Sequence, residues 1–200
     1  EIKHGLELSD DFKGPQLELQ WTFWKEYAPQ SLTFKEDILW MKAKGRTPAD
    51  GRVLLTTAED KNYETQVEVN VGKGNTAGLL LYYSEKAYAG VVSDGKNFTI
   101  YRNAENSFTL PNKLGKRFLV KIQNQGNSVR MAVSKDGKEW TTLVENMDVS
   151  QLHHNNYGGF YALRIGLLSS GKRQRRLPSV SLPQRHPAGK GDGGLLDGLP

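Results

Sequence analysis

The feature that most constrains the fold is a short alternation of apolar and polar residues that recurs along the chain. Apolar side chains take every second position in several runs, namely 17–23, 67–71, 118–122 and 129–133. Successive side chains of a strand point to opposite faces, so this period of two predicts strands with one buried face. Residues 79–83 are apolar at every position, which is typical of a central strand covered on both faces. No window of 12 residues shows the period of a helix.

Turn signals separate these runs at the spacing of a β-sandwich. The clearest are Asp50-Gly51, Asp94-Gly95 and Asp136-Gly137, since Asp-Gly readily adopts the positive φ values of a tight hairpin turn. About ten to twelve strands would account for residues 10–170. We therefore predict an all-β fold, a two-sheet antiparallel sandwich formed by residues 10–171.

The net charge of +5 is concentrated at one end of the chain. Residues 172–200 hold six Lys/Arg and two Asp/Glu, which leaves the other 171 residues nearly neutral. That distribution argues against a nucleic-acid-binding face on the folded part. The segment has four Pro, five Gly, no aromatic residue and no alternation, so we expect a disordered basic tail.

Other features of the composition exclude several kinds of site. The chain has no Cys, which removes disulfides, thiolate metal sites and Cys nucleophiles. It has no apolar run near 18 residues and therefore no predicted transmembrane helix. It begins with Glu1 rather than Met, so we expect residues 1–9 to be a linker from an upstream domain.

The candidate catalytic and metal-binding residues fail on geometry. Glu64 and Glu68 share one strand face, but four positions place them about 13 Å apart, whereas a glycosidase needs its two carboxyl groups within about 5–9.5 Å. His153 and His154 are adjacent, so on an extended strand they would point to opposite faces. Asp10-Asp11 are the candidate oxygen ligands for a structural calcium ion, although nothing else in the sequence supports such a site. We predict no catalytic residue, no metal site and no cofactor.

The segment 155–160 is the most informative candidate binding site. Asn155 and Asn156 precede Tyr157, and the two following glycines allow close backbone approach, so the Tyr157 ring is available to a sugar or to another domain. A Gly-rich bulge before a strand from Phe160 to Leu168 explains the same residues equally well. Trp24 is a further candidate contact, although core packing is favoured for this residue and for Tyr27.

A set of short segments resembles a known family when taken in order. The segments are Asp10-Asp11-Phe12, Trp21-Thr22-Phe23-Trp24, Ser31-Leu32-Thr33, residues 77–83 and Tyr157-Gly158-Gly159-Phe160. Together they resemble the C-terminal concanavalin A-like (jelly-roll) domain of bacterial glycoside hydrolase family 43, whose members are β-xylosidases and α-L-arabinofuranosidases. In that family a five-bladed propeller ahead of the sandwich holds the catalytic acids, and a loop of the sandwich can reach the active-site mouth. The resemblance implies that this loop is 155–159 here, with Tyr157 as its main contact.

The C-terminus departs from the family pattern. Family members close the sandwich with an aromatic-rich last strand, and nothing after Gly171 provides one in the sequence. Codons can be chosen for residues 173–200 so that a one-nucleotide shift reads a strand-like VFRQFRY. We therefore expect that residues 172–200 are a frameshift product.

The resemblance implies a non-catalytic accessory sandwich of a xylan-degrading glycoside hydrolase. Its partners would be the catalytic propeller of the same parent chain and a xylo- or arabino-oligosaccharide, with no nucleic acid and no membrane. The alternative is a free-standing carbohydrate-binding module or lectin. We expect a bacterial protein of the periplasm or the extracellular space.

Overall fold

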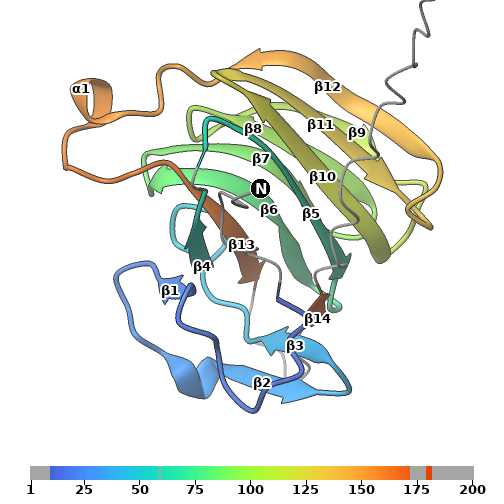
Figure 1. Cartoon of the computed structure of the whole chain (residues 1–200). Coiled ribbons are helices and arrows are strands. Elements are labelled where there is room, and N and C mark those ends of the chain that lie inside the picture. The colour runs from blue at the N-terminus through green and yellow to red at the C-terminus, as the bar shows by residue number, and fades with distance from the viewer. Residues whose placement is uncertain (1–9, 59, 172–178, 182–200) are drawn as a thin grey trace, which may run out of the picture.

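Two antiparallel sheets of seven strands each form the molecule (Figure 1), as seen in a computed structural model that describes residues 10–58, 60–171 and 179–181. The first sheet has the order β1 (Thr22–Phe23), β4 (Arg52–Thr57), β13 (Arg164–Gly171), β6 (Asn75–Ser84), β7 (Ala87–Ser93), β8 (Asn97–Arg102) and β9 (Glu105–Pro111). The second has the order β12 (Trp140–Asp148), β11 (Ser128–Ser134), β10 (Arg117–Gln125), β5 (Asn62–Asn70), β14 (Ser179–Ser181), β3 (Ile38–Met41) and β2 (Leu32–Lys35). The predicted all-β antiparallel sandwich is confirmed.

Two short helical turns accompany the sheets. A 3-10 turn, η1, spans Pro29–Ser31, and a single helical turn, α1, spans His154–Tyr157. In Figure 1, α1 projects from one side of the sandwich and leads through an extended segment into β13. Within the described ranges, no helix is long and apolar enough to cross a membrane.

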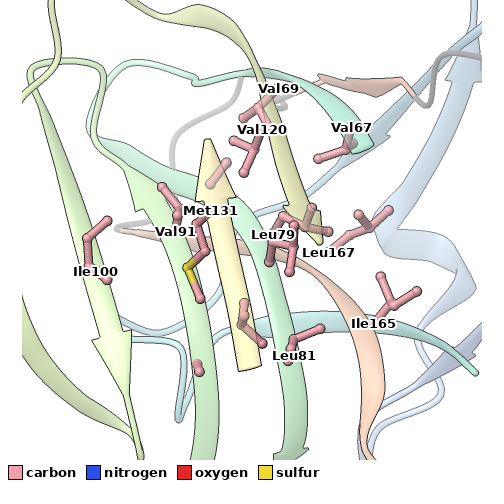
Figure 2. Close-up of a cluster of buried hydrophobic side chains, with 14 of the residues drawn as sticks. Val67, Val69, Leu79, Leu81, Val91, Ile100, Val120, Met131, Ile165 and Leu167 are labelled. Atoms are coloured by element: carbon pink, nitrogen blue, oxygen red, sulfur yellow. The ribbon is translucent and has the colours of Figure 1, made fainter. Parts of the chain in front are cut away.

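The main core lies between the sheets and follows from the alternating sequence. On β10 the exposure alternates along the strand, and Phe118, Val120 and Ile122 are at most 1% exposed. Burying a side chain of this size stabilises the fold by about 1.5–3 kcal/mol. Figure 2 shows Val120 in one cluster with side chains from β5, β6, β11 and β13.

A second apolar cluster lies on the opposite face of the first sheet. Its residues are Val53, Leu55, Leu80, Tyr82, Tyr88, Val92 and Leu168. Trp24, Tyr101 and Ala104 pack against it. Every residue of β6 except Thr76 is buried, which confirms the strand apolar on both faces that residues 79–83 predict.

The structure differs from the sequence prediction at both ends of the sandwich. The prediction of a strand along 17–23 is wrong for most of that range, because β1 covers only Thr22–Phe23 and Leu19 is fully exposed. The chain instead turns there, with the Trp21 N–H donating to the Glu18 carbonyl. The expected disorder of 172–200 is wrong at Ser179–Ser181, since β14 pairs with both β3 and β5. The remaining residues of that segment and the predicted linker 1–9 lie outside the described residues.

Candidate functional site: an aromatic loop surface

A loop between α1 and β13 is fastened to the first sheet by one hydroxyl group. The Tyr83 hydroxyl lies 2.7 Å from the Gly158 carbonyl oxygen and 3.0 Å from that of Gly159. Tyr83 is 1% exposed, so this anchor belongs to the core. Gly159 has φ 71°, and a Cβ there would lie 2.6 Å from the Tyr161 ring. The glycine is therefore required both by its backbone angle and by the close approach of Tyr161.

The loop meets the segment that follows β1 through aromatic rings. The Trp24 and Tyr161 rings are 5.1 Å apart in an edge-to-face arrangement, and Trp24 makes a similar contact with Tyr82 at 5.4 Å. Tyr82 in turn stacks on Tyr88 at 5.7 Å. Each such pair adds about 0.5–1.5 kcal/mol beyond simple burial. The chain of rings holds the loop against the second apolar cluster.

Two aromatic rings on this loop face solvent. Phe160 is 97% exposed and Tyr161 is 49% exposed. The His154 ring stacks beside Phe160 at 5.9 Å. We call Trp24, His154, Phe160 and Tyr161 the aromatic loop surface. Large apolar side chains gathered in this way mark interaction sites on soluble proteins.

Charged side chains border the surface. The Lys25 ammonium lies 2.5 Å from the Glu85 carboxylate and 5.6 Å from the centre of the Trp24 ring. Burial of Glu85 opposes its ionisation, but the hydrogen bond from Lys25, the backbone N–H of Glu85 and the charge of Lys25 outweigh burial and lower its pKa. The Arg164 guanidinium lies 5.3 Å from the Trp24 ring.

The predicted contact residues differ in how far the structure exposes them. Tyr157 is half-buried and packs against the main core, so its ring is less available to a sugar or to another domain than the sequence suggests. Phe160 takes the exposed position instead. Asn155 and Asn156 lie exposed on α1, where the Asn156 amide donates to the Gln151 side chain at 2.6 Å. Trp24 packs as expected against buried rings.

Sequence reasoning missed Phe160 and Tyr161 as site residues. Both stand in the segment that the sequence assigns to a strand beginning at Phe160, whereas β13 begins at Arg164. The two glycines before them are the signal that could have placed a loop here. For Tyr27 the expected core packing is wrong, because this ring is 83% exposed at the sheet edge, against Phe23.

The other candidate residues have structural partners. Asp10 accepts hydrogen bonds from the Phe12 N–H and the Trp21 indole N–H, each at 2.7 Å, and Asp11 pairs with Lys13. His153 caps α1 through its ring nitrogen. In the part of the chain that the structure describes, no three His, Cys, Asp or Glu residues form a group that could hold a metal ion.

Glu64 and Glu68, the carboxylate pair that the sequence analysis considers, lie on the outer face of the second sheet. Glu64 forms a cross-strand ion pair with Lys121 at 3.1 Å, and Glu68 forms one with Arg117.

A family model described as the beta xylosidase C-terminal concanavalin A-like domain of family GH43 matches residues 9–179. The chain belongs to this family. The match covers every other strand of the two sheets and extends to the first residue of β14. The resemblance that the sequence suggests is therefore confirmed, and the chain is a C-terminal β-sandwich domain of the GH43 xylosidase type.

Solved GH43 structures share the fold at low sequence identity. The GH43 protein BlXynB of Bacillus licheniformis superposes with a TM-score of 0.74 at 17% identity, and the Bacteroides ovatus xyloglucan PUL protein GH43B with 0.71 at 16%. The xylan beta-1,4-xylosidase of Bacillus halodurans superposes with 0.70 at 15%. Each comparison covers 86% of this chain but only 37% of the other. In these longer chains the GH43 sandwich accompanies a catalytic domain. The comparison with curated protein sequences gives no match.

Proposed function

We propose that this GH43 sandwich is a non-catalytic accessory domain that packs on the catalytic propeller of a xylan-degrading enzyme and shapes its active-site entrance. The enzyme would be of the β-xylosidase or α-L-arabinofuranosidase type and would act on xylo- or arabino-oligosaccharides. The observation that carries the proposal is the exposure of Phe160 on a loop whose backbone is fastened to a buried tyrosine. An exposed ring on a restrained loop loses little conformational entropy when a partner covers it.

The residues of the loop have different roles in this proposal. Phe160 and Tyr161 contact the partner domain or the bound sugar, with Trp24 supporting them from beneath. Asn155 and Asn156 supply polar contacts at the rim, because both are exposed on α1. Tyr157 supports the loop through its packing on the main core rather than through direct contact.

The test compares two alanine variants in the parent enzyme and in the isolated chain. Phe160→Ala should lower kcat/KM by about tenfold, the scale of an interface anchor, and leave the isolated chain's stability within about 0.5 kcal/mol. Tyr157→Ala should instead destabilise the isolated chain, because its ring packs on the core. Unchanged kcat/KM in the Phe160→Ala enzyme would contradict the proposal.

The alternative, a free-standing carbohydrate-binding module, would need a bare aromatic ring on a sheet face. Trp140 is half-buried on the outer face of the second sheet. The Lys121 ammonium lies 4.3 Å from the centre of its ring, and Lys121 is also ion-paired with Glu64 at 3.1 Å. A sugar stacking on that side of the ring would have to displace an ion-paired lysine, so we favour the accessory role.

A further inference from the structure

Most of the exposed large apolar side chains lie on one side of the sandwich. Among the described residues, the exposed ones are Leu19, Tyr27, Phe108, Phe160 and Tyr161. All of these except Phe108 lie on the segments around β1 and after α1, which meet where the Trp24 and Tyr161 rings are 5.1 Å apart. Figure 1 shows β1 and α1 on the same side of the molecule. The aromatic loop surface accounts for Phe160 and Tyr161, but it leaves Leu19 and Tyr27 without a role.

Leu19 and Tyr27 flank the two-residue strand β1 at the edge of the first sheet. Leu19 is fully exposed, and the turn around it is closed by the Trp21 N–H, which donates to the Glu18 carbonyl oxygen. The exposed Tyr27 ring lies edge-on against Phe23 of β1 at 5.9 Å. Four residue steps separate Leu19 from Phe23, so these two residues lie at most about 14 Å apart. We call Leu19, Phe23 and Tyr27 the β1 surface.

The turn that carries Tyr27 is tied to two distant parts of the chain. Lys25 has φ 58°, a left-handed backbone angle that is unfavourable for a residue with a Cβ. The Lys25 ammonium pairs at 2.5 Å with Glu85, between β6 and β7, and Glu26 pairs with Lys44, between β3 and β4. Backbone held in such a conformation by its surroundings occurs most often at binding and catalytic sites. A ring presented on a restrained turn also loses little conformational entropy when a partner covers it.

The N-terminal end of the sandwich is fastened next to the β1 surface. Asp10 is buried, and its carboxylate accepts hydrogen bonds from the Phe12 N–H and the Trp21 indole N–H, both at 2.7 Å. The Phe12 and Trp21 rings lie 5.9 Å apart. Trp21 directly precedes β1, so these contacts hold Asp10 at this edge of the first sheet. Whatever precedes Asp10 in the parent chain therefore starts from this edge.

We propose that the β1 surface is a second docking area and that its occupant is the catalytic domain ahead of the sandwich in the parent chain. This inference rests on the proposed function and names a further part of the sandwich that the partner covers. The family model describes a C-terminal domain, and this chain covers only 37% of the GH43 chain BlXynB. Most of such a parent chain would therefore lie upstream of Asp10, on the side from which the β1 surface is reached.

The β1 surface continues into the aromatic loop surface. Trp24 follows Phe23 directly and contacts Tyr161, so one partner can cover both areas. A standard interface covers about 800 Å² on each partner, which is wide enough to include both. The side chains favour a protein over a sugar, because aromatic residues are enriched in protein interfaces and the Leu19 side chain offers a sugar neither a ring face nor a hydrogen bond.

Hydroxyl-radical footprinting of the isolated chain and of the full-length parent enzyme tests this inference, because it measures how far each side chain is open to solvent. In the isolated chain, Leu19 and Tyr27 should be modified rapidly. In the full-length enzyme, the modification rate of Tyr27 should fall by about tenfold, from 83% exposure to the near-complete burial of an interface core. Leu19 should be protected with it. Phe108 on β9, at the opposite edge of the first sheet, is the internal control and should react equally in both.

The double variant Leu19→Ser, Tyr27→Ser gives a second measurement. Both side chains are exposed, so the Tm of the isolated chain should stay within about 2 °C of the wild type. In the full-length enzyme the Tm of the sandwich should fall toward that of the isolated chain, because docking stabilises a domain only while the partner is bound. Tyr27→Phe, with Leu19 retained, is the matched control and should behave as the wild type in both contexts, since it keeps the ring.

Unchanged modification of Leu19 and Tyr27 in the full-length enzyme would overturn the inference. If Phe160 and Tyr161 are then still protected, the proposed accessory role stands and the second docking area is wrong; if none of the four is protected, both are wrong. Slow modification of Leu19 and Tyr27 already in the isolated chain, together with the sedimentation of a dimer, would assign the β1 surface to a second copy and also overturn the inference. An equal fall in Tm in both contexts for the double variant would make the two residues structural.

Discussion

The Tyr83 hydroxyl offers a direct test of how the loop between α1 and β13 is held. Tyr83→Phe removes a single O–H group and leaves the buried ring in place, so core packing is preserved. That hydroxyl has one hydrogen, shared between the carbonyl oxygens of Gly158 and Gly159 at 2.7 Å and 3.0 Å. One hydrogen bond contributes about 0.5–1.5 kcal/mol net. Because both glycines are exposed, water can solvate their carbonyls in the variant, and no further penalty arises.

The expected loss is therefore about 1 kcal/mol, which corresponds to a Tm decrease of about 2–4 °C for a domain of this size. The substitution should have a larger effect on the local dynamics of the loop than on the stability of the whole domain. Amide hydrogen exchange of residues 158–163 should accelerate, while that of β10 and β11 should not change. Tyr27→Phe is the matched control, because the Tyr27 ring is 83% exposed. Equal exchange rates for the loop in Tyr83→Phe and in the wild-type chain would refute the assignment of Tyr83 as the anchor.

Three further outcomes are expected of the 200-residue chain. It should not hydrolyse aryl β-xylosides or aryl α-L-arabinofuranosides, and turnover above a heat-treated sample by rigorously purified protein would contradict the non-catalytic role. Burial outweighs the hydrogen bonds from Phe12 and Trp21 and raises the pKa of Asp10 above 3.8, so folded Asp10 keeps its proton to higher pH than the unfolded chain does. The stability that protonated Asp10 contributes should fall as the pH rises from its pKa in the unfolded chain through its higher pKa in the folded chain. Asp10→Asn should remove this pH-dependent change from a series of Tm measurements against pH. Deleting residues 182–200 should leave the Tm unchanged, because the segment has little apolar content, whereas deleting 172–200 also removes β14 and should lower it. Resequencing the gene tests the proposed frameshift in this segment, and an intact reading frame would exclude it.

The sequence predicts the sandwich well where side-chain alternation and burial coincide. Val67 and Val69 on β5, and Phe118 to Ile122 on β10, face the core because a strand repeats every two residues. The same pattern misleads at Leu17 and Leu19. There the chain is positioned by a tertiary contact between Asp10 and the Trp21 indole, and no periodic pattern reports such a contact.

The loop between α1 and β13 was harder to predict because its anchor is distant in sequence. Tyr83 stands 75 residues before Gly158, and its hydroxyl donates a hydrogen bond to the loop backbone there. Phe160 therefore resembles the start of a strand when only its neighbours are considered.

The position of β14 has a consequence for how the domain is made. Among the described strands, β14 is the one that connects the hairpin of β2 and β3 to the rest of the second sheet, since Val180 pairs with both Leu39 and Val69. During synthesis on the ribosome, the hairpin of β2 and β3 cannot pair with the rest of the second sheet until β14, more than a hundred positions later, has been made. Pairing between such distant segments is slow, so the hairpin should be the last part of the sandwich to close and the part most exposed to proteases and chaperones in the newly made chain.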